Sequence, residues 1–148
     1  WSVLTGYPVS SFEFRGRLKS HTPPEILARD MLVLFHYQDP AHFYYVHFSA
    51  VSDDLHNIIG LVNGSDRVKI NREPAGKSIG RLVDSAWHTF KVTFDAGTGE
   101  IQAFLDDMEE PILTATDSTL RSGLVGVGSF DDTGSFDDLM LWGTMPEN

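Results

Sequence analysis

The chain has 148 residues, and its eleven basic and twenty-one acidic side chains give a formal net charge of −10. This charge repels nucleic-acid phosphates, which excludes nucleic acid as a partner, and no apolar run approaches the roughly 18 residues of a membrane helix, which excludes a membrane span. Because cysteine does not occur, disulfides, cysteine-ligated metals and thiol nucleophiles are excluded as well. We predict one domain over residues 1–148, large enough to bury a core of its own.

Apolar and polar residues alternate in short, regularly spaced runs that are separated by Gly, Pro, Asn and Asp, a pattern typical of half-buried strands in stacked antiparallel sheets. The fold class predicted is therefore all-β, a two-sheet antiparallel β-sandwich of the jelly-roll type. We expect nine strands, over residues 12–19, 31–37, 43–49, 57–62, 67–71, 87–94, 101–106, 123–128 and 137–142.

Two connections carry specific turn signals. The segment Thr22-Pro-Pro-Glu25 resembles a helix cap with proline at the first helical position, which predicts one helical turn over residues 25–29. Asn63-Gly64 separates two predicted strands and predicts a type I′ hairpin, because both central residues of that turn need positive φ.

Three segments together resemble the concanavalin A-like lectin and glucanase superfamily: F-H-Y-Q-D-P-A-H-F-Y-Y-V over residues 35–46, W-H-T-F-K-V over 87–92, and F-D-D-L-M-L over 136–141 after a glycine-initiated strand. The order of these segments is similar to laminin G-like jelly rolls and to the 3-keto-disaccharide hydrolase family. The resemblance spans residues 10–143 and implies two curved sheets, a concave face that holds glycans, and carbohydrate as the ligand class. The Glu-x-Asp-x-x-Glu strand that carries the carboxylates of the glucanases does not occur.

The resemblance also implies a structural calcium ion near the chain ends. Asp137 and Asp138, at the start of the last predicted strand, are the leading ligand candidates, since calcium takes six to eight carboxylate and carbonyl oxygens. The alternative is that these aspartates merely initiate a turn and keep it solvated.

Four of the six histidines fall between residues 36 and 56, together with several tyrosines. If adjacent strands pair there, His36, Tyr45 and His47 converge on one face, where Arg15 and Arg17 join them. In such a site arginine and histidine donate to sugar oxygens, and Tyr45 stacks on a sugar ring.

We therefore predict a glycan-recognition domain, a module of a secreted or periplasmic carbohydrate-active protein, with ligand-binding residues Arg15, Arg17, His36, Tyr45 and His47. The start at Trp1, without an initiator methionine, fits a mature or excised product. Two alternatives stay open: a glycoside hydrolase or polysaccharide lyase that uses the same side chains as acid and base, and a laminin G-like structural or adhesion domain that binds a protein through its loops.

Overall fold

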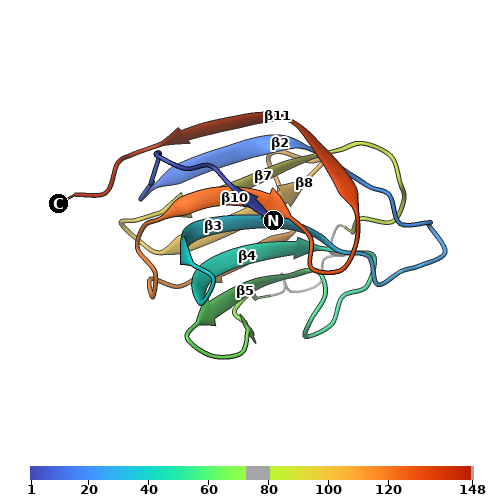
Figure 1. Ribbon diagram of the computed structural model, residues 1–148, viewed down its shortest axis with the longest axis horizontal. Helices are drawn as coiled ribbons and strands as arrows, with labels where there is room; N and C mark the ends of the chain where they lie inside the picture. The colour runs from blue at the N-terminus through green and yellow to red at the C-terminus, as the bar shows by residue number, and fades with distance from the viewer. Residues whose placement is uncertain (73–80, 148) are drawn as a thin grey trace.

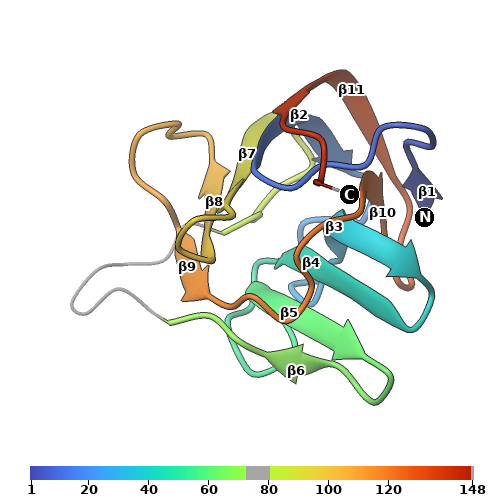
Figure 2. The same cartoon turned by 90° about the vertical axis from the view of Figure 1, so that its left-hand side faces the viewer.

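The computed structural model describes residues 1–72 and 81–147, and its strands form two antiparallel sheets that stack on each other (Figures 1 and 2). The six-stranded sheet has the order β1 (Ser2–Val3), β10 (Leu124–Gly128), β3 (Met31–Asp39), β4 (His42–Phe48), β5 (Ile58–Asn63) and β6 (Val68–Lys69). The five-stranded sheet has the order β11 (Gly134–Gly143), β2 (Phe12–Ser20), β7 (His88–Asp95), β8 (Glu100–Leu105) and β9 (Leu113–Thr116). The predicted jelly-roll β-sandwich is confirmed.

The main core lies between the two sheets, where the alternation seen in the sequence places its apolar side chains. Every second residue of β2 is buried, and the first four of these, from Phe12 to Leu18, are each paired with a residue of β7 that faces the same way. The other sheet contributes the inward positions of β3 and β4, so that aromatic rings from both sheets interlock; the largest members are Phe12, Phe14, Phe35, Tyr44, Phe48, Phe90 and Phe94.

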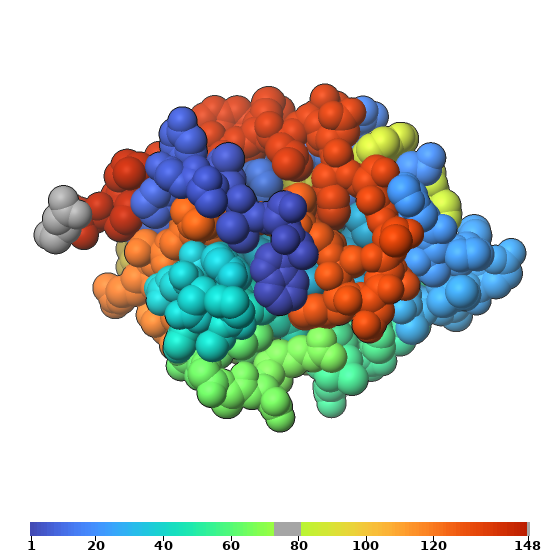
Figure 3. All heavy atoms as spheres, in the orientation of Figure 1, coloured from blue at the N-terminus to red at the C-terminus, as the bar shows by residue number. Residues whose placement is uncertain are grey.

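The outer face of the six-stranded sheet carries a second, smaller apolar cluster. Leu32 and Leu34 of β3 point outward there, and Phe43, Tyr45 and Ile58 from β4 and β5 complete the cluster. The chain between β10 and β11 covers this face and packs Phe130 on the cluster. In Figure 3 the first residues, in blue, lie on the same face beside this orange-red segment. The sheet is therefore covered on both sides, which is uncommon for an antiparallel sheet.

An irregularity in β3 changes the direction of His36. The pairing register of β3 shifts relative to both of its neighbours in this part of the strand, and His36 has a φ of 45°. Its ring consequently points into the main core, between Phe12 and Phe94, instead of alternating with Phe35. Simple period-2 alternation had placed it on the outer face.

The helical turn predicted for residues 25–29 is wrong. The segment forms a hydrogen-bonded turn in which Ile26 N–H donates to Pro23 O, and then continues as irregular chain. Arg29 lies buried here, and its guanidinium donates to the carbonyl oxygens of Pro23 and Ile26 and to that of Asp84. The arginine thus takes the carbonyl groups that a helix would have used for its own hydrogen bonds.

The type I′ hairpin at Asn63-Gly64 is also wrong. Gly64 has a φ of +74°, but Asn63 is not among the described non-glycine residues with positive φ. The strand predicted over residues 67–71 shortens to β6, and a longer connection precedes it, with Gly64 N–H bonded to Ala41 O. Two short strands, β1 and β9, were not predicted. No helix in the described ranges is long and apolar enough to cross a membrane.

Candidate functional site

The five predicted ligand-binding residues do not share one surface. Arg15 and Arg17 project from β2 on the outer face of the five-stranded sheet. The Nε of Arg15 lies 2.9 Å from Glu13 Oε2, and the Nε of Arg17 lies 2.8 Å from Asp138 Oδ2. Both guanidinium groups therefore have carboxylate partners, on the opposite side of the molecule from Tyr45 and His47.

His36 is enclosed in the main core and is not exposed to solvent. Its Nε2 lies 2.8 Å from Ser10 O and its Nδ1 lies 2.9 Å from Leu120 O. Burial lowers the pKa of His36, although the two carbonyl groups act in the opposite direction. A ring that is packed among aromatic side chains, with both nitrogens directed at backbone carbonyls, holds the fold together and does not contact a ligand. The predicted convergence of His36 with Tyr45 and His47 is therefore wrong.

Tyr45 and His47 do lie together, on the outer face of the six-stranded sheet. Gly60 on β5 is the direct partner of Tyr45, and a Cβ there would come within 2.2 Å of the tyrosine ring, so glycine is what leaves room for it. Phe130 covers both side chains, with ring centroids 5.4 Å from Tyr45 and 6.3 Å from His47. His47 and Phe130 also line a small cavity, whereas Tyr45 lies outside its lining.

This cavity, which we call the Asp30 pocket, has a volume of about 110 Å³. Loops contribute most of it: Asp30 precedes β3, His56 precedes β5, Arg67 precedes β6, and residues 130–132 connect β10 to β11. Only His47 comes from a strand, β4. The side chains that matter for the chemistry are Asp30, His47, His56, Arg67, Phe130 and Asp132.

Asp30 fixes the position of the loop that carries Phe130. Its Oδ2 accepts the backbone N–H groups of Phe130 at 2.7 Å and Asp131 at 2.8 Å, whereas its buried Oδ1 has no hydrogen-bond partner. Burial raises the pKa of the Asp30 carboxyl, and the two N–H groups counteract part of this effect. A buried oxygen without a partner is uncommon in folded proteins, and it leaves an acceptor free for a hydrogen-bond donor from outside the chain.

His47 faces this oxygen as a neutral donor. The backbone N–H of Asn57 donates to Nδ1 of His47 at 3.3 Å, which leaves the ring proton on Nε2, 3.5 Å from Asp30 Oδ1. Burial, together with the positive charges of His56 and Arg67, lowers the pKa of His47 to about 4. At neutral pH the pocket therefore holds an unpaired carboxyl oxygen of Asp30 beside an uncharged imidazole donor, at a separation slightly too long for a good hydrogen bond.

The rim of the pocket combines cations, carboxylates and an aromatic ring. The Arg67 guanidinium lies 4.8 Å from the centre of the Phe130 ring, a cation–π contact that holds it over the pocket. His56 donates from Nδ1 to Asp53 at 2.9 Å, and its ring lies 5.3 Å from that of His47. With Asp131 and Asp132 on the other side, hydrogen-bond donors and acceptors alternate around an aromatic wall.

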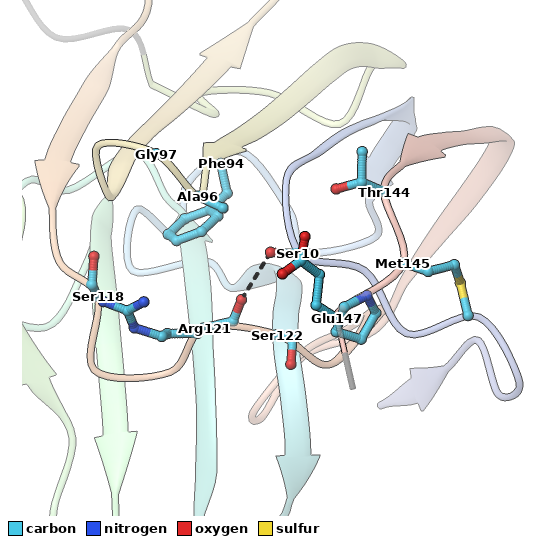
Figure 4. Close-up of a pocket in the computed structure, with 11 residues that line it drawn as sticks. Ser10, Phe94, Ala96, Gly97, Ser118, Arg121, Ser122, Thr144, Met145 and Glu147 are labelled. Atoms are coloured by element: carbon cyan, nitrogen blue, oxygen red, sulfur yellow. Dashed lines mark hydrogen bonds between the residues drawn. The ribbon is translucent and has the colours of Figure 1, made fainter.

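A larger cavity of about 600 Å³ lies at the end of the sandwich, where the loop before β2, the β7–β8 turn and the C-terminal segment meet (Figure 4). Its polar groups are hydroxyls, Arg121 and Glu147, and Ser10 Oγ donates to the backbone oxygen of Arg121 at 3.4 Å. Phe94 is the one buried residue among those that line it. We favour the Asp30 pocket as the functional site because two of its polar side chains, Asp30 and His47, are buried and one carboxyl oxygen of Asp30 is unpaired.

The residues named for calcium do not fit that ion. Asp137 and Asp138 lie on β11 opposite Arg17, whose guanidinium contacts both carboxylates, and Asp137 Oδ1 accepts the backbone N–H of Asp138. Within residues 1–72 and 81–147, no three His, Asp or Glu side chains gather as a metal site. The two carboxylates share a single guanidinium, and they supply at most four of the six to eight oxygens that calcium takes.

No protein-family model and no curated protein matches the sequence. Among solved structures, the chain is similar to the carbohydrate-binding module CBM66 from Bacillus subtilis, with a TM-score of 0.67 and 16% identity over 92% of this chain and 77% of that one. It is also similar to a homodimeric agglutinin, CG-16, from chicken liver, with a TM-score of 0.61 and 12% identity over 95% and 98% of the two chains. A third similar structure is a putative glycosyl hydrolase from Parabacteroides distasonis, with a TM-score of 0.60 and 9% identity over 94% and 74%.

These similarities establish the fold. The chain adopts the jelly roll of the concanavalin A-like lectins and glucanases, as the order of its aromatic and turn motifs predicted. Identities of 9 to 16% do not carry residue roles from one chain to another, so the site rests on the geometry given above.

Sequence analysis missed Asp30, Arg67 and Phe130. Asp30 stood next to a predicted strand, but no pattern distinguished it from the other aspartates of a strongly acidic chain. Arg67 was assigned to a strand, and Phe130 fell in an unassigned segment. The available signal was weak: Asp131 and Asp132 formed one of several acidic pairs, and His56 belonged to the histidine-rich window.

Proposed function

We propose that this chain binds carbohydrate in the Asp30 pocket. The observation that carries the proposal is the pair formed by Asp30 and His47, a buried acceptor and a buried donor held side by side beneath an aromatic ring. A sugar hydroxyl both donates and accepts, so adjacent hydroxyls on one ring match such a pair. Small-molecule sites commonly combine an apolar wall with a few placed polar groups in this way.

The charges of the pocket favour an uncharged sugar. Three carboxylates, those of Asp30, Asp131 and Asp132, accompany the single guanidinium of Arg67, and His47 is neutral at pH 7. In a chain with a net charge of −10, this excess of negative charge repels uronates and sulfated glycans. The similarity in fold to a carbohydrate-binding module and to an agglutinin supports the same ligand class.

The experiment is a screen against neutral glycans followed by titration calorimetry on the best ligand, with Arg67→Ala as the test variant. Loss of one charge-assisted hydrogen bond, which contributes about 1.5–3 kcal/mol, lowers affinity roughly 10- to 100-fold. Arg121→Ala is the matched control, since it removes another exposed arginine that lines the large cavity of Figure 4. Equal affinities of the Arg67 variant and the wild type, or loss of binding in the Arg121 variant, would place the site elsewhere.

A second candidate function is glycoside hydrolysis in the same pocket. The raised pKa of Asp30 is the property of a general acid, and Asp131 and Asp132 provide further carboxylates nearby. Incubation of the bound glycan with the wild type and with Asp30→Asn separates binding from catalysis. Release of fragments by the wild type but not by the variant supports hydrolysis, whereas binding without fragments supports recognition alone.

A further inference from the structure

Trp1 lies at the edge of the Asp30 pocket with much of its indole free. Its ring packs against Phe43, with centroids 5.4 Å apart, and edge-on against Phe130 at 6.2 Å. Even so, 49% of the residue stays exposed. Figure 1 places the N-terminus over the six-stranded sheet, next to β3 and β10. Arg67 contacts Phe130, and Phe130 contacts Trp1, so the three side chains form a continuous row that ends in the half-exposed Trp1.

A second hollow begins where this row ends. It has a volume of about 320 Å³ and is lined, among others, by Trp1, Ser2, Ser129, Asp132 and Phe136; we call it the Trp1 hollow. Asp132 also lines the Asp30 pocket, so the two cavities meet at this residue, on either side of the chain between β10 and β11. The Ser129 hydroxyl donates to the backbone oxygen of Asp132, and this hydrogen bond stabilises the segment that separates the two cavities.

The two volumes differ in a way that matters for the ligand. The Asp30 pocket, at about 110 Å³, is far smaller than the roughly 300–1,000 Å³ of common small-molecule sites, so it admits one sugar residue at most. The Trp1 hollow is about three times larger, and the half-exposed Trp1 and Asp132 both line it. An aromatic face next to a hydrogen-bond acceptor matches a sugar ring, which has an apolar C–H face and polar edges.

We propose that the Asp30 pocket and the Trp1 hollow are two subsites of one extended site, which takes two consecutive residues of a neutral oligosaccharide. This inference rests on the carbohydrate-binding function proposed above. The first sugar residue enters the Asp30 pocket, and the linkage passes over the chain at residues 130–132. The second residue stacks on Trp1 while one of its hydroxyls donates to Asp132. The ligand class is thus an oligosaccharide, and a monosaccharide occupies only part of the site.

The chain offers a matched control for Trp1. Trp142 is 51% exposed, almost the same fraction, and projects from β11 on the outer face of the five-stranded sheet. It lines neither the Asp30 pocket nor the Trp1 hollow. Substitution of each tryptophan by alanine removes a similar exposed aromatic surface, and the two changes differ only in their distance from the proposed subsites.

The test is titration calorimetry with gluco-, manno-, galacto- and fructo-oligosaccharides of one, two and three residues. For the series that binds, the wild type is expected to gain roughly tenfold in affinity from one residue to two, and little from two to three. Trp1→Ala is expected to abolish that gain, Trp1→Phe to restore part of it, and Trp142→Ala to behave as wild type.

The outcomes separate the two proposals. If Arg67→Ala weakens monosaccharide binding while Trp1→Ala keeps the full gain from one residue to two, the extended site is wrong and the carbohydrate-binding function stands. The same conclusion follows if the wild type shows no gain with a second residue. If no saccharide of any length binds the wild type, both proposals are overturned together.

Discussion

The charged side chains on the outer faces of the two sheets differ in their exposure to solvent and in their pairing. On the five-stranded sheet, Arg17 pairs with Asp137 and Asp138 at the surface, and the side chains of the three residues are 41%, 59% and 62% exposed. On the six-stranded sheet, Asp30 is only 5% exposed and leaves one oxygen without a partner, next to a buried histidine. Charged groups that satisfy one another in water and charged groups that are buried and left incompletely paired serve different purposes.

The difference follows from what covers each face. On the five-stranded sheet, the side chains of Arg17, Asp137 and Asp138 stay largely exposed, so these ion pairs remain hydrated and contribute little to stability. The six-stranded sheet is overlaid by the chain that carries Phe130, which removes water from Asp30 and His47. Burial raises the cost of each unmatched polar group and also strengthens whatever hydrogen bond a ligand forms with it.

Substitution of Asp30 is expected to have the largest effect on stability. Asp30→Ala removes the acceptor of two backbone N–H groups, those of Phe130 and Asp131, and is expected to lower the free energy of unfolding by about 3 kcal/mol. Asp137→Ala on the other face is expected to cost less than about 1 kcal/mol. Urea unfolding of the two variants measures the contrast, and equal losses would show that the two faces do not differ.

Asp30→Asn is the variant that keeps the comparison interpretable. Asparagine retains a carbonyl oxygen in the same place, so it continues to accept the N–H groups of Phe130 and Asp131 but carries no charge. We expect it to lose much less stability than Asp30→Ala and still to show altered sugar affinity. A fully stable asparagine variant that binds sugar like the wild type would exclude Asp30 as a contact for the ligand.

The free energy of unfolding is expected to depend on pH through His47. Its pKa is about 4 in the folded protein and about 6.5 in the unfolded chain, so between these values the unfolded state binds more protons. The stability that His47 contributes is therefore present above pH 6.5 and is lost as pH falls toward 4. From this residue alone, the free energy of unfolding is expected to be about 2 kcal/mol lower at pH 5 than at pH 7.

Comparison of variants isolates that contribution. Asp30 acts with the opposite sign, because its pKa is raised in the folded state and its protonation at low pH favours folding. His47→Gln should therefore flatten the fall in stability between pH 7 and pH 5, while the exposed His21, replaced in the same way, should leave it as in the wild type. An unchanged pH profile in the His47 variant would mean that His47 does not titrate as an isolated buried histidine.

The sheets were predictable from the sequence because one local rule builds most of them. The alternation in β2 and β7 needs no knowledge of partners: apolar side chains at every second position must face an apolar layer. The rule failed where the backbone departs from it, as at the β3 irregularity that turns His36 inward, and where a buried side chain such as Arg29 binds carbonyl groups from distant segments. Neither the irregularity in β3 nor the hydrogen bonds of Arg29 can be recognised from the neighbouring residues in the sequence.

Only the residues of the candidate site that lie on a strand could be predicted from the sequence. Tyr45 and His47 belong to β4, and alternation placed them correctly on one face. Asp30, Arg67 and Phe130 come from three separate loops, and they meet because β3 lies between β10 and β4 and because Asp30 binds the loop after β10. That neighbourhood depends on the strand order of the sheet, which alternation does not specify.

The smallest expected effects on stability come from the exposed ion pairs of Arg17 with Asp137 and Asp138, and they also test the predicted calcium site. Arg17→Ala removes a solvent-exposed ion pair and a cation–π contact with Trp87 at 4.9 Å, and is expected to cost less than about 1 kcal/mol, and less still at high salt. Because the Arg17 guanidinium contacts both carboxylates and already occupies the place of a cation between them, added calcium should not shift the wild-type unfolding midpoint, and a chelator should not lower it. A calcium-dependent rise in the wild type that disappears in Asp138→Asn would instead show that the ion displaces the arginine and binds there.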